Sequence, residues 1–565
     1  MTSEKLRQEF LTFFQNKGHQ VVPSSPLIPG DCSVLFTTAG MQQFKPYYLG
    51  KKSPFGPNVA SCQKCFRTSD INEVGDNSHL TFLEMLGNFS FGHYFKQKAI
   101  ELAFDFIVNK LGLAIDYVSI FSGDKVVPKD EESKKIWLSL GLKKEQIKEY
   151  GRQDNFWGPT GKEGPCGPTS EIYIKGIEVW NLVFNEYYQD QNKKLTALQQ
   201  KGVDTGMGLE RLAMVCQNKE NLFETDLFLP IVKCLQSYNP KEKNSQKEQR
   251  IIVDHVRSAV FLIAEDIFPS NTERGYVLRR ILRRAIRYGK ILDLPRRFLI
   301  PLARETINIY GNTYYALKKK ENSILSVIEH EEEKFSDALS EGLKVFEKHY
   351  QAGKFNGPDS GLVAFDLFQS YGFPAELIDE LLKERGKSIN LKAFNRALEK
   401  HRQISRQGME AKFSRLGNNT KKEATKLHTA THLLQASLRK VLGSHVRQMG
   451  SQITDQTLRF DFSHSKSMTD EEIKKVENLV NQQIKHNLTV KKEEMSFQQA
   501  IKQGALAFFK EKYPEKVTVY SINNFSKEIC AGPHVKKTGE LGQFKIIKEK
   551  SSSAGVRRIK AVLQN

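Results

Sequence analysis

Four residues toward the end of the chain have the types and spacing of a metal site. His428 and His432 are four positions apart in a segment of helical periodicity, so both imidazoles lie on one helix face. Cys530 and His534 repeat this spacing in the segment EICAGPHVKK, where Gly-Pro indicates a loop. Three imidazoles and one thiolate suit Zn²⁺, whereas the plain alternative is an amphipathic helix carrying two histidines. A site with an open position would activate a hydrolytic water and a closed one would be structural, and both stay open here.

Two arginines lie beside turns in the first half of the chain. Arg67 follows a strand-like stretch, and Arg211 begins a helix after the glycine-rich segment VDTGMGLER. Arginines from separate elements can bind the phosphates of a nucleotide through paired hydrogen bonds. Neither a GxxxxGK[ST] loop nor a GxGxxG turn occurs, so a nucleotide site here is neither a P-loop nor a dinucleotide fold. The alternative is two surface arginines beside turns.

The charge balance favours a polyanionic partner. The chain has 85 Lys and Arg against 65 Asp and Glu, a formal net charge of +20 over 565 residues. No apolar run could span a bilayer, and the N-terminus enters a helical pattern without a signal or transit segment. We therefore expect a cytoplasmic protein with no membrane partner. Cys62-x-x-Cys65 resembles half of a zinc knuckle, but no second CxxC accompanies it, so we expect no metal there.

The patterns divide the chain into an α+β multidomain protein. Residues 1–240 mix helices with strand-like segments, and residues 241–410 are helical throughout. A polar linker is expected over 411–423, followed by a second α+β domain over 424–565.

The helix expected over 274–292 has an arginine-rich face. Apolar side chains occupy one side, and no acidic residue occurs between Arg274 and Asp293. A solvated charged face would normally include acids, so an exposed RNA-binding surface is favoured. The residues of this expected surface are Arg279, Arg280, Arg283, Arg284, Arg287 and Lys290.

Several long motifs resemble the alanyl-tRNA synthetase family. They are LFTTAGMQQFKPYYLG, TFLEMLGNFSFGHYF, DNFWGPTGKEGPCGPTSEIY, VWNLVF, VDTGMGLERLAMV, TERGYVLRRILRRAIRYG and YGFPAEL, together with the HxxxH and CxxxH pairs. The resemblance implies a class II synthetase antiparallel sheet with flanking helices, a helical tRNA-recognition domain and a zinc-containing editing domain. It implies an enzyme that activates L-alanine with ATP and Mg²⁺ and transfers it to tRNA(Ala).

The resemblance also implies roles for single residues. Arg67 would contact the α-phosphate, Arg211 the ATP tail, and Phe82 would stack on adenine with Glu84 on the same strand face. Asp204 would receive the alanine ammonium, and Trp157 and Val183 would wall the side-chain pocket. Glu171 and Glu210 are the candidates for magnesium or adenylate contacts.

By the same resemblance, the second α+β domain would correct errors. A pocket for a methyl group cannot strongly reject glycine or serine, so hydrolysis at a second site is the remedy. His428, His432, Cys530 and His534 would bind zinc in a domain that deacylates Ser- and Gly-tRNA(Ala), with Gln448 in the editing pocket. Pro533 stands where the family usually has threonine. An alternative is a zinc-dependent deacylase of mischarged tRNA with an inert synthetase core.

Other features depart from the family pattern. Lys290 and Gln369 stand where an asparagine and an aspartate usually read the G·U pair of the acceptor stem. The family usually has a small β-barrel before the editing domain and an oligomerisation domain after it, and this sequence shows neither. We therefore expect a reduced, monomeric form.

Overall fold

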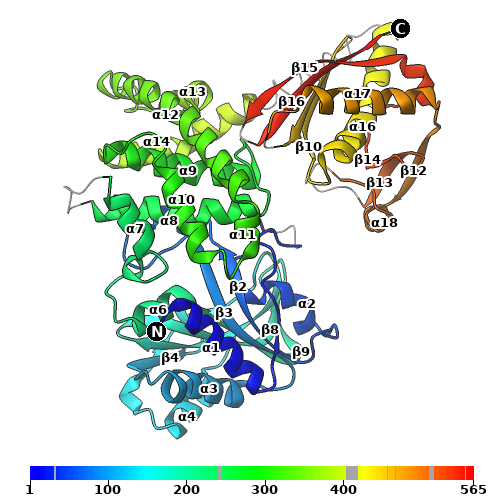
Figure 1. Ribbon diagram of the computed structural model, residues 1–565. Coiled ribbons are helices and arrows are strands. Elements are labelled where there is room, and N and C mark those ends of the chain that lie inside the picture. Colours follow the sequence, from blue (N-terminus) through cyan, green and yellow to red (C-terminus); the bar gives the residue numbers. More distant parts are fainter. Residues whose placement is uncertain are drawn as a thin grey trace. The chain divides into compact units, whose positions relative to one another are not determined.

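The computed structural model describes residues 1–30, 34–238, 245–401, 418–454, 456–464, 466–507, 515–553 and 555–564. The chain forms two compact units, Met1–Glu333 and Lys334–Asn565 (Figure 1). Most of the expected linker, up to residue 417, lies outside the described residues. No described helix is long and apolar enough to cross a membrane. The expected boundary between residues 240 and 241 stays a prediction.

The first unit is built on a large sheet whose central strands are antiparallel. Its strand order is β1-β2-β3-β9-β8-β7-β4-β5, with β6 paired to β7 and parallel pairs only at β1–β2 and β4–β5. The strands are β1 (Gln20–Val21), β2 (Asn58–Phe66), β3 (Phe82–Phe91), β4 (Tyr117–Phe121), β5 (Ile147–Tyr150), β6 (Phe156–Trp157), β7 (Gly164–Ile174), β8 (Ile177–Gln189) and β9 (Leu195–Gly208).

Helices cover one face of this sheet, and the core lies beneath them. Phe10 of α1, Phe106 and Trp180 of β8 meet edge to face there. Leu86 of β3 and Met207 of β9 belong to the same buried cluster, so their strand positions face these helices. The helices are α1 (Ser3–Asn16), α3 (Lys96–Phe104), α4 (Glu131–Ser139) and α6 (Leu209–Cys216), with short α2 (Lys45–Tyr48) and α5 (Arg152–Asn155) elsewhere in the unit.

The glycine-rich segment before Arg211 is extended rather than a turn. Asp204 to Gly208 end the long strand β9, and α6 begins at Leu209. A Cβ on Gly206 would lie 3.1 Å from the sulfur of Met85 on the neighbouring strand, so a side chain here would crowd the sheet surface. The absence of side chains at this point keeps the sheet face open beside Asp204.

The helical periodicities after residue 240 are confirmed. In the first unit, α8 packs against α9 and α10, and α8 contacts β3 of the sheet (Figure 1). The helices are α7 (Leu229–Gln236), α8 (Gln246–Ala264), α9 (Glu273–Ile291), α10 (Leu299–Tyr310), α11 (Tyr315–Lys319) and α12 (Glu321–Gln351). The second unit begins within α12, at Lys334, and continues with α13 (Ser360–Tyr371) and α14 (Ala375–Lys383).

The rest of the second unit is α+β. A four-stranded sheet, β10-β11-β16-β15, and a three-stranded sheet, β12-β13-β14, accompany the long helix α16. One apolar cluster joins Leu434 of α16, Phe460 of β11 and Val480 of α17. The elements are α16 (Asn418–Leu442), β10 (Gln448–Ile453), β11 (Leu458–Ser463), α17 (Asp470–Lys485), β12 (Val490–Ser496), α18 (Phe497–Lys502), β13 (Lys516–Ile522), β14 (Ser526–Ile529), β15 (Gln543–Ser553) and β16 (Val556–Gln564).

Candidate active site and metal centre

The open face of the large sheet gathers the residues expected to activate an amino acid. Asp204 on β9 is paired directly with Val183 on β8, which is paired with Thr169 on β7. Directly paired residues of an antiparallel sheet share a face. Met85 is the strand partner of Gly208. Gly208 lies four residues after Asp204 on β9, so Gly208 and Met85 are on the same face as Asp204. This face is opposite the one covered by α1 and α6.

Arg67 belongs to the same face. It follows the end of β2, and its amide donates to the Thr81 carbonyl at 2.8 Å, which continues the β2–β3 ladder. Gln63 pairs with Met85, and Arg67 lies four residues after Gln63, so the alternation puts both on the face of Asp204. The Arg67 Nε donates to the Thr38 carbonyl at 3.2 Å, which fixes the guanidinium stem.

Asp204 is a buried carboxylate without a protein partner. Its exposed fraction is 5%, and none of the described residues donates a hydrogen bond to it. Burial alone raises the pKa of its carboxyl to about 8. A buried carboxylate that lacks a counterion is a favourable site for a ligand ammonium, because binding supplies the charge that burial has removed from water.

Arg211 contacts Glu178, whose charge in turn acts on Glu171. Its Nη1 donates to Glu178 at 2.9 Å, and its Cγ lies 3.7 Å from the position of a Cβ on Gly208. Glu171, paired with Asn181 on the open face, accepts from the Asn181 amide at 2.9 Å. Burial, followed by the charge of Glu178, raises the pKa of Glu171 to about 7. Carboxylates at this position are suited to binding Mg²⁺.

The expected nucleotide roles of Phe82 and Glu84 are corrected by the structure. Both lie on the same face of β3 as Leu86, which packs in the core beneath the helices. This face points away from Asp204. Phe82 is fully buried and stacked on Phe261 of α8, with ring centroids 3.9 Å apart. Glu84 is also fully buried and accepts two hydrogen bonds from Arg7 of α1. Neither side chain is open to ATP.

Glu210 is likewise excluded from the open face. It is 1% exposed, forms an ion pair with the fully buried Arg257, and accepts from the backbone amide of Glu84. The residues of β3 that do share the face of Arg67 are Leu83 and Met85, which are half-buried. Sequence reasoning missed them, because the alternation that identifies them is counted from Thr81, whose pairing with Arg67 only the structure shows.

Trp157 and Val183 lie where a small side chain would be enclosed. Val183 is 4% exposed and is the direct strand partner of Asp204. Trp157 packs against the apolar cluster of the open face, which includes Met41 and Phe89. The predicted alanine pocket is therefore compatible with the structure.

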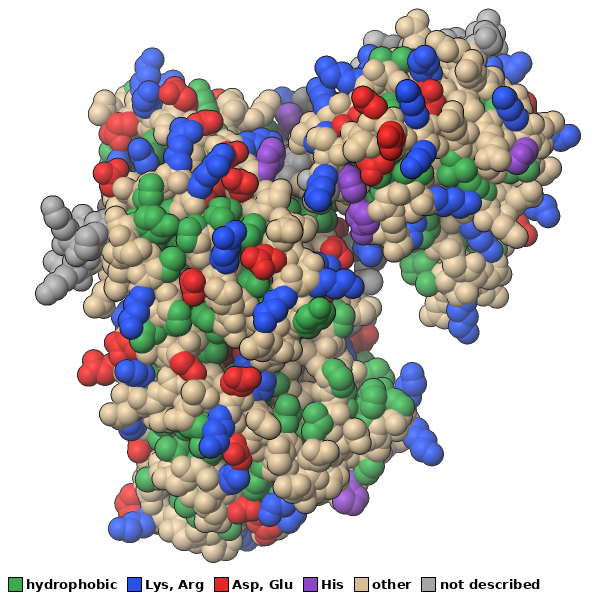
Figure 2. All heavy atoms as spheres, in the orientation of Figure 1, with side chains coloured by type: hydrophobic (Ala, Val, Ile, Leu, Met, Phe, Trp, Pro, Cys, Tyr) green, Lys and Arg blue, Asp and Glu red, His purple; other side chains and the backbone are tan. Residues whose placement is uncertain are grey.

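The expected arginine surface on α9 is wrong for three of its residues. Arg283 and Arg284 are each 6% exposed and Arg287 is 2% exposed. Arg283 donates to Glu331 of α12 at 2.7 Å, so the acids missing from α9 come from another helix. Lys290 is exposed, while Arg279 and Arg280 are half-buried. In the view of Figure 2, lysine and arginine side chains are scattered among acidic ones rather than gathered in one patch.

The other departures from the family pattern lie at the surface. Gln369 near the end of α13 is exposed, as Lys290 is on α9.

Cys62 and Cys65 are three positions apart on β2, so they point to opposite faces, and both thiols are buried.

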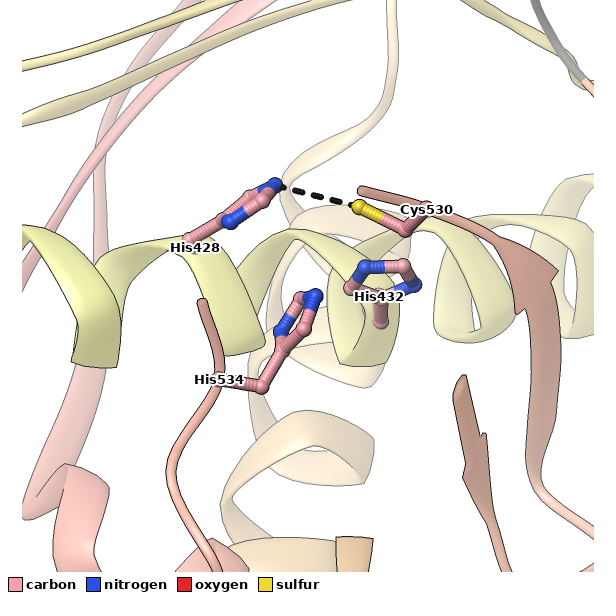
Figure 3. A group of neighbouring side chains, drawn as sticks. All are labelled: His428, His432, Cys530 and His534. Carbon is pink, nitrogen blue, oxygen red and sulfur yellow. Dashed lines mark hydrogen bonds between the residues drawn. The ribbon is translucent and has the colours of Figure 1, made fainter. Parts of the chain in front are cut away.

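The expected metal ligands of the second unit converge. One ligand atom from each of His428, His432, Cys530 and His534 can be chosen so that all lie within 4.8 Å of one another. Figure 3 shows the two α16 imidazoles facing the thiol and ring that follow β14. The Cys530 sulfur is 3.5 Å from the Nε2 of His428. Burial opposes ionisation of this thiol, but the three neighbouring histidines, His428 first, outweigh it and lower its pKa to about 3.

A second set of contacts holds the Nδ1 side of every imidazole. The His428 Nδ1 is 3.2 Å from the Pro533 carbonyl, and the His534 Nδ1 is 3.3 Å from the Thr429 hydroxyl. The His432 Nδ1 lies 2.6 Å from a Glu528 oxygen, which is an ion-pair distance without hydrogen-bond geometry. The three Nε2 atoms and the sulfur remain for an ion, and the buried Nε2 of His534 has no hydrogen-bond partner. This donor set fits zinc, and outer contacts of this kind orient metal-binding histidines.

The loop backbone at Gly532 passes close to the His428 ring. A Cβ at this position would lie 2.0 Å from the Cε1 of His428. A side chain at this position would therefore force the imidazole or the loop to shift. Gln448, expected in the same pocket, begins β10, and its amide donates to Ser451 at 3.0 Å. Its place in an editing pocket stays a prediction.

Family comparisons agree with this arrangement of sheet and metal centre. A family model described as tRNA synthetases class II (A) matches residues 5–457. A second, the threonyl and alanyl tRNA synthetase second additional domain, matches residues 517–560, which include Cys530 and His534. The expected fold of a class II aminoacyl-tRNA synthetase is thus confirmed.

The similar proteins are ligases that attach alanine to tRNA. The alanine–tRNA ligase of Borreliella afzelii is 45% identical over 592 aligned positions, covering all of both chains. That of Treponema pallidum is 44% identical over all of this chain and 98% of its own. That of Thermotoga maritima is 38% identical over all of this chain and 80% of its own. The chain belongs to the alanyl-tRNA synthetase family and is therefore an enzyme, an aminoacyl-tRNA synthetase with alanine–tRNA ligase function at the family level.

Proposed function

We propose that the open sheet face activates alanine and that the metal centre of the second unit removes errors. Asp204 would receive the alanine ammonium, with Val183 and Trp157 around the methyl group. Arg67 would contact the α-phosphate and Arg211 the far end of ATP. Glu171, together with Glu178, would hold Mg²⁺ on the nucleotide.

The activation step places demands on charge rather than on proton transfer. An alanine carboxylate oxygen attacks the α-phosphorus, the bond to the bridging oxygen breaks, and pyrophosphate leaves with the electron pair. Negative charge builds on the phosphoryl oxygens, so preorganised cations are the main requirement. The alanyl group then passes to the terminal ribose of tRNA(Ala), releasing AMP.

The second site answers a limit on recognition at the first. A methyl-sized pocket loses only about 1–3 kcal/mol when glycine leaves a gap, and an added hydroxyl is also hard to reject. The quartet of the second unit would hold Zn²⁺, which supplies a Lewis acid or a fixed structural point when bound. Ser- and Gly-tRNA(Ala) are the substrates we assign to this site, and Gln448 would line it.

The observation that carries the proposal is that a guanidinium and a buried carboxyl group lie on the same open face of the sheet. Arg67 offers a cation for phosphate, and the buried Asp204, which has no partner among the described residues, offers a carboxyl group that a ligand ammonium can ionise. Burying a carboxyl group without a partner among the described residues is costly, and a bound ammonium would supply the missing counter-charge.

The test separates the two sites. We expect Arg67→Ala to abolish alanine-dependent ATP–pyrophosphate exchange and to leave hydrolysis of Ser-tRNA(Ala) intact. Cys530→Ala should do the reverse. Exchange lost in Cys530→Ala with hydrolysis retained would overturn the assignment.

A further inference from the structure

A buried network ties helices α8 and α9 to both ends of the segment that carries Arg67. This segment, residues 67–81, joins β2 to β3 and contains the short helical turn η2 (Ser69–Asn72). Arg284 of α9 donates to the carbonyl of Ile71 at 2.7 Å, and Arg280 donates to the Asn72 side chain at 2.8 Å. The near end of the segment is therefore held by two arginines of one helix face.

The hydrogen-bond network continues from Arg284 to residues of α8. The Arg284 Nη1 lies 3.0 Å from the Nε2 of His255, and the Nδ1 of His255 lies 2.9 Å from Asp254. An arginine can only donate, so these contacts assign the His255 proton to Nδ1, where it is donated to Asp254. His255 and Asp254 are both fully buried.

Asp254 completes the connection at the far end of the segment. It accepts from the Thr81 amide at 2.9 Å and from the Thr81 hydroxyl at 2.6 Å. The carbonyl of Thr81 in turn accepts from the Arg67 amide. A continuous path of hydrogen bonds thus runs from Arg284 through His255 and Asp254 to the backbone of Arg67.

The position of Arg67 matters because its contribution depends on alignment. A preorganised cation stabilises a developing charge without further reorganisation, and a displacement of about 1 Å can cost about 100-fold in rate. Among the described residues the Arg67 side chain hydrogen-bonds the Thr38 carbonyl alone, so its backbone anchor carries much of its placement. A buried network that is fully connected can supply that rigidity.

We propose that Arg284 is a positioning residue for Arg67, acting through Ile71 and the His255–Asp254 pair, so that α9 serves amino-acid activation rather than RNA contact at this point. The proposal rests on the α-phosphate role proposed above for Arg67. It accounts for an arginine that is 6% exposed on a helix expected to face RNA.

The chain offers a matched control in the next residue. Arg283 is equally buried, at 6% exposed, and its Nε bonds Glu331 on α12 rather than the segment after Arg67. Loss of either arginine removes a buried cation from α9, and loss of Arg283 also leaves the buried Glu331 without its closest cation, so Arg283→Ala is the more severe of the two for stability. They differ in whether the removed side chain reaches Ile71.

The assay is ATP–pyrophosphate exchange by the full chain, which involves no tRNA. We expect Arg284→Ala to lower kcat/KM for ATP at least tenfold while the KM for alanine stays within twofold, since Asp204 lies on β9 outside the network. Arg284→Lys, which keeps one donor, should recover part of the loss. Arg283→Ala should remain within threefold of the wild type in both parameters. Melting temperatures show which variants fold.

Arg280→Ala is the milder variant and keeps the test decisive if Arg284→Ala does not fold. It removes the contact with Asn72 and should lower kcat/KM for ATP about two- to fivefold. The proposal is overturned if Arg280 and Arg284 variants exchange normally and lose only tRNA charging. It is also overturned if Arg283→Ala loses as much as Arg284→Ala.

Failure of this proposal is distinguishable from failure of the proposed function. If Arg67→Ala leaves exchange intact, the role of Arg67 itself is wrong. If Arg67→Ala abolishes exchange while Arg284→Ala exchanges normally, only the positioning role is wrong.

Discussion

The burial of Asp204 predicts that alanine binding strengthens as pH rises. Its carboxyl has a pKa of about 8, against about 3.9 for an ordinary aspartate. At neutral pH most free enzyme molecules therefore carry a protonated Asp204, which cannot pair with the alanine ammonium. Binding must first release that proton, and the cost is about 1.4 kcal/mol for each pH unit below the pKa.

The size of the effect follows from the ionised fraction. With a pKa of about 8, that fraction rises from about 1% at pH 6 to about 50% at pH 8, so the KM for alanine should fall about 50-fold. A pKa anywhere from about 7 to about 9 still gives a fall of about tenfold or more. The same protonation stabilises the fold at low pH, and this stability is lost as pH rises between about 4 and about 8.

The assay is alanine-dependent ATP–pyrophosphate exchange measured from pH 6 to pH 8, with the KM for ATP followed in parallel. Asp204→Asn is the control, because it keeps the shape and cannot ionise. We expect its alanine KM to be high and independent of pH, and its melting temperature at pH 8 to exceed that of the wild type. A flat alanine KM in the wild type, or the same slope in Asp204→Asn, would refute the reasoning.

Three further predictions concern the metal centre and the charge of the chain. Glu528→Gln should weaken zinc binding about 10- to 100-fold in a chelator competition, because it removes the charge 2.6 Å from the Nδ1 of His432; unchanged affinity would show that this contact does not orient the ligand. Gly532→Ala should lower the zinc content and the Ser-tRNA(Ala) hydrolysis, since its Cβ would overlap His428, whereas Gly450→Ala, with open space around it, should do neither. The KM for tRNA in charging should rise more than about tenfold between 50 and 200 mM salt while exchange is unaffected, given the net charge of +20; a flat response would count against attraction by the basic surplus.

The convergence of the four candidate metal ligands was predictable because its signal is local. The i, i+4 spacing on a helix fixes which way His428 and His432 point, and Cys530 and His534 needed only a loop to join them. The contacts behind the ligands were not predictable, because Glu528 and Pro533 approach from the strand β14 and the loop after it. Their positions depend on tertiary packing.

The open sheet face was predicted in part. Arg67, Asp204 and Val183 follow from motif position, but the face of Phe82 and Glu84 depends on the β2–β3 register, which the sequence does not display. The prediction of an exposed arginine surface on α9 failed for a related reason. Acid-free helix faces indicate exposure only when no other helix supplies the counterions, and here Glu331 of α12 does so. Buried cations paired across long sequence distances have no local signature.

The most direct test of the account is ATP–pyrophosphate exchange by the purified chain across all the standard amino acids. The account predicts a strong signal with alanine and weaker signals with serine and glycine, all of them lost in Arg67→Ala and kept in Cys530→Ala. Exchange with none of the amino acids would contradict the account, because the open sheet face would then be inert and the metal centre would act alone.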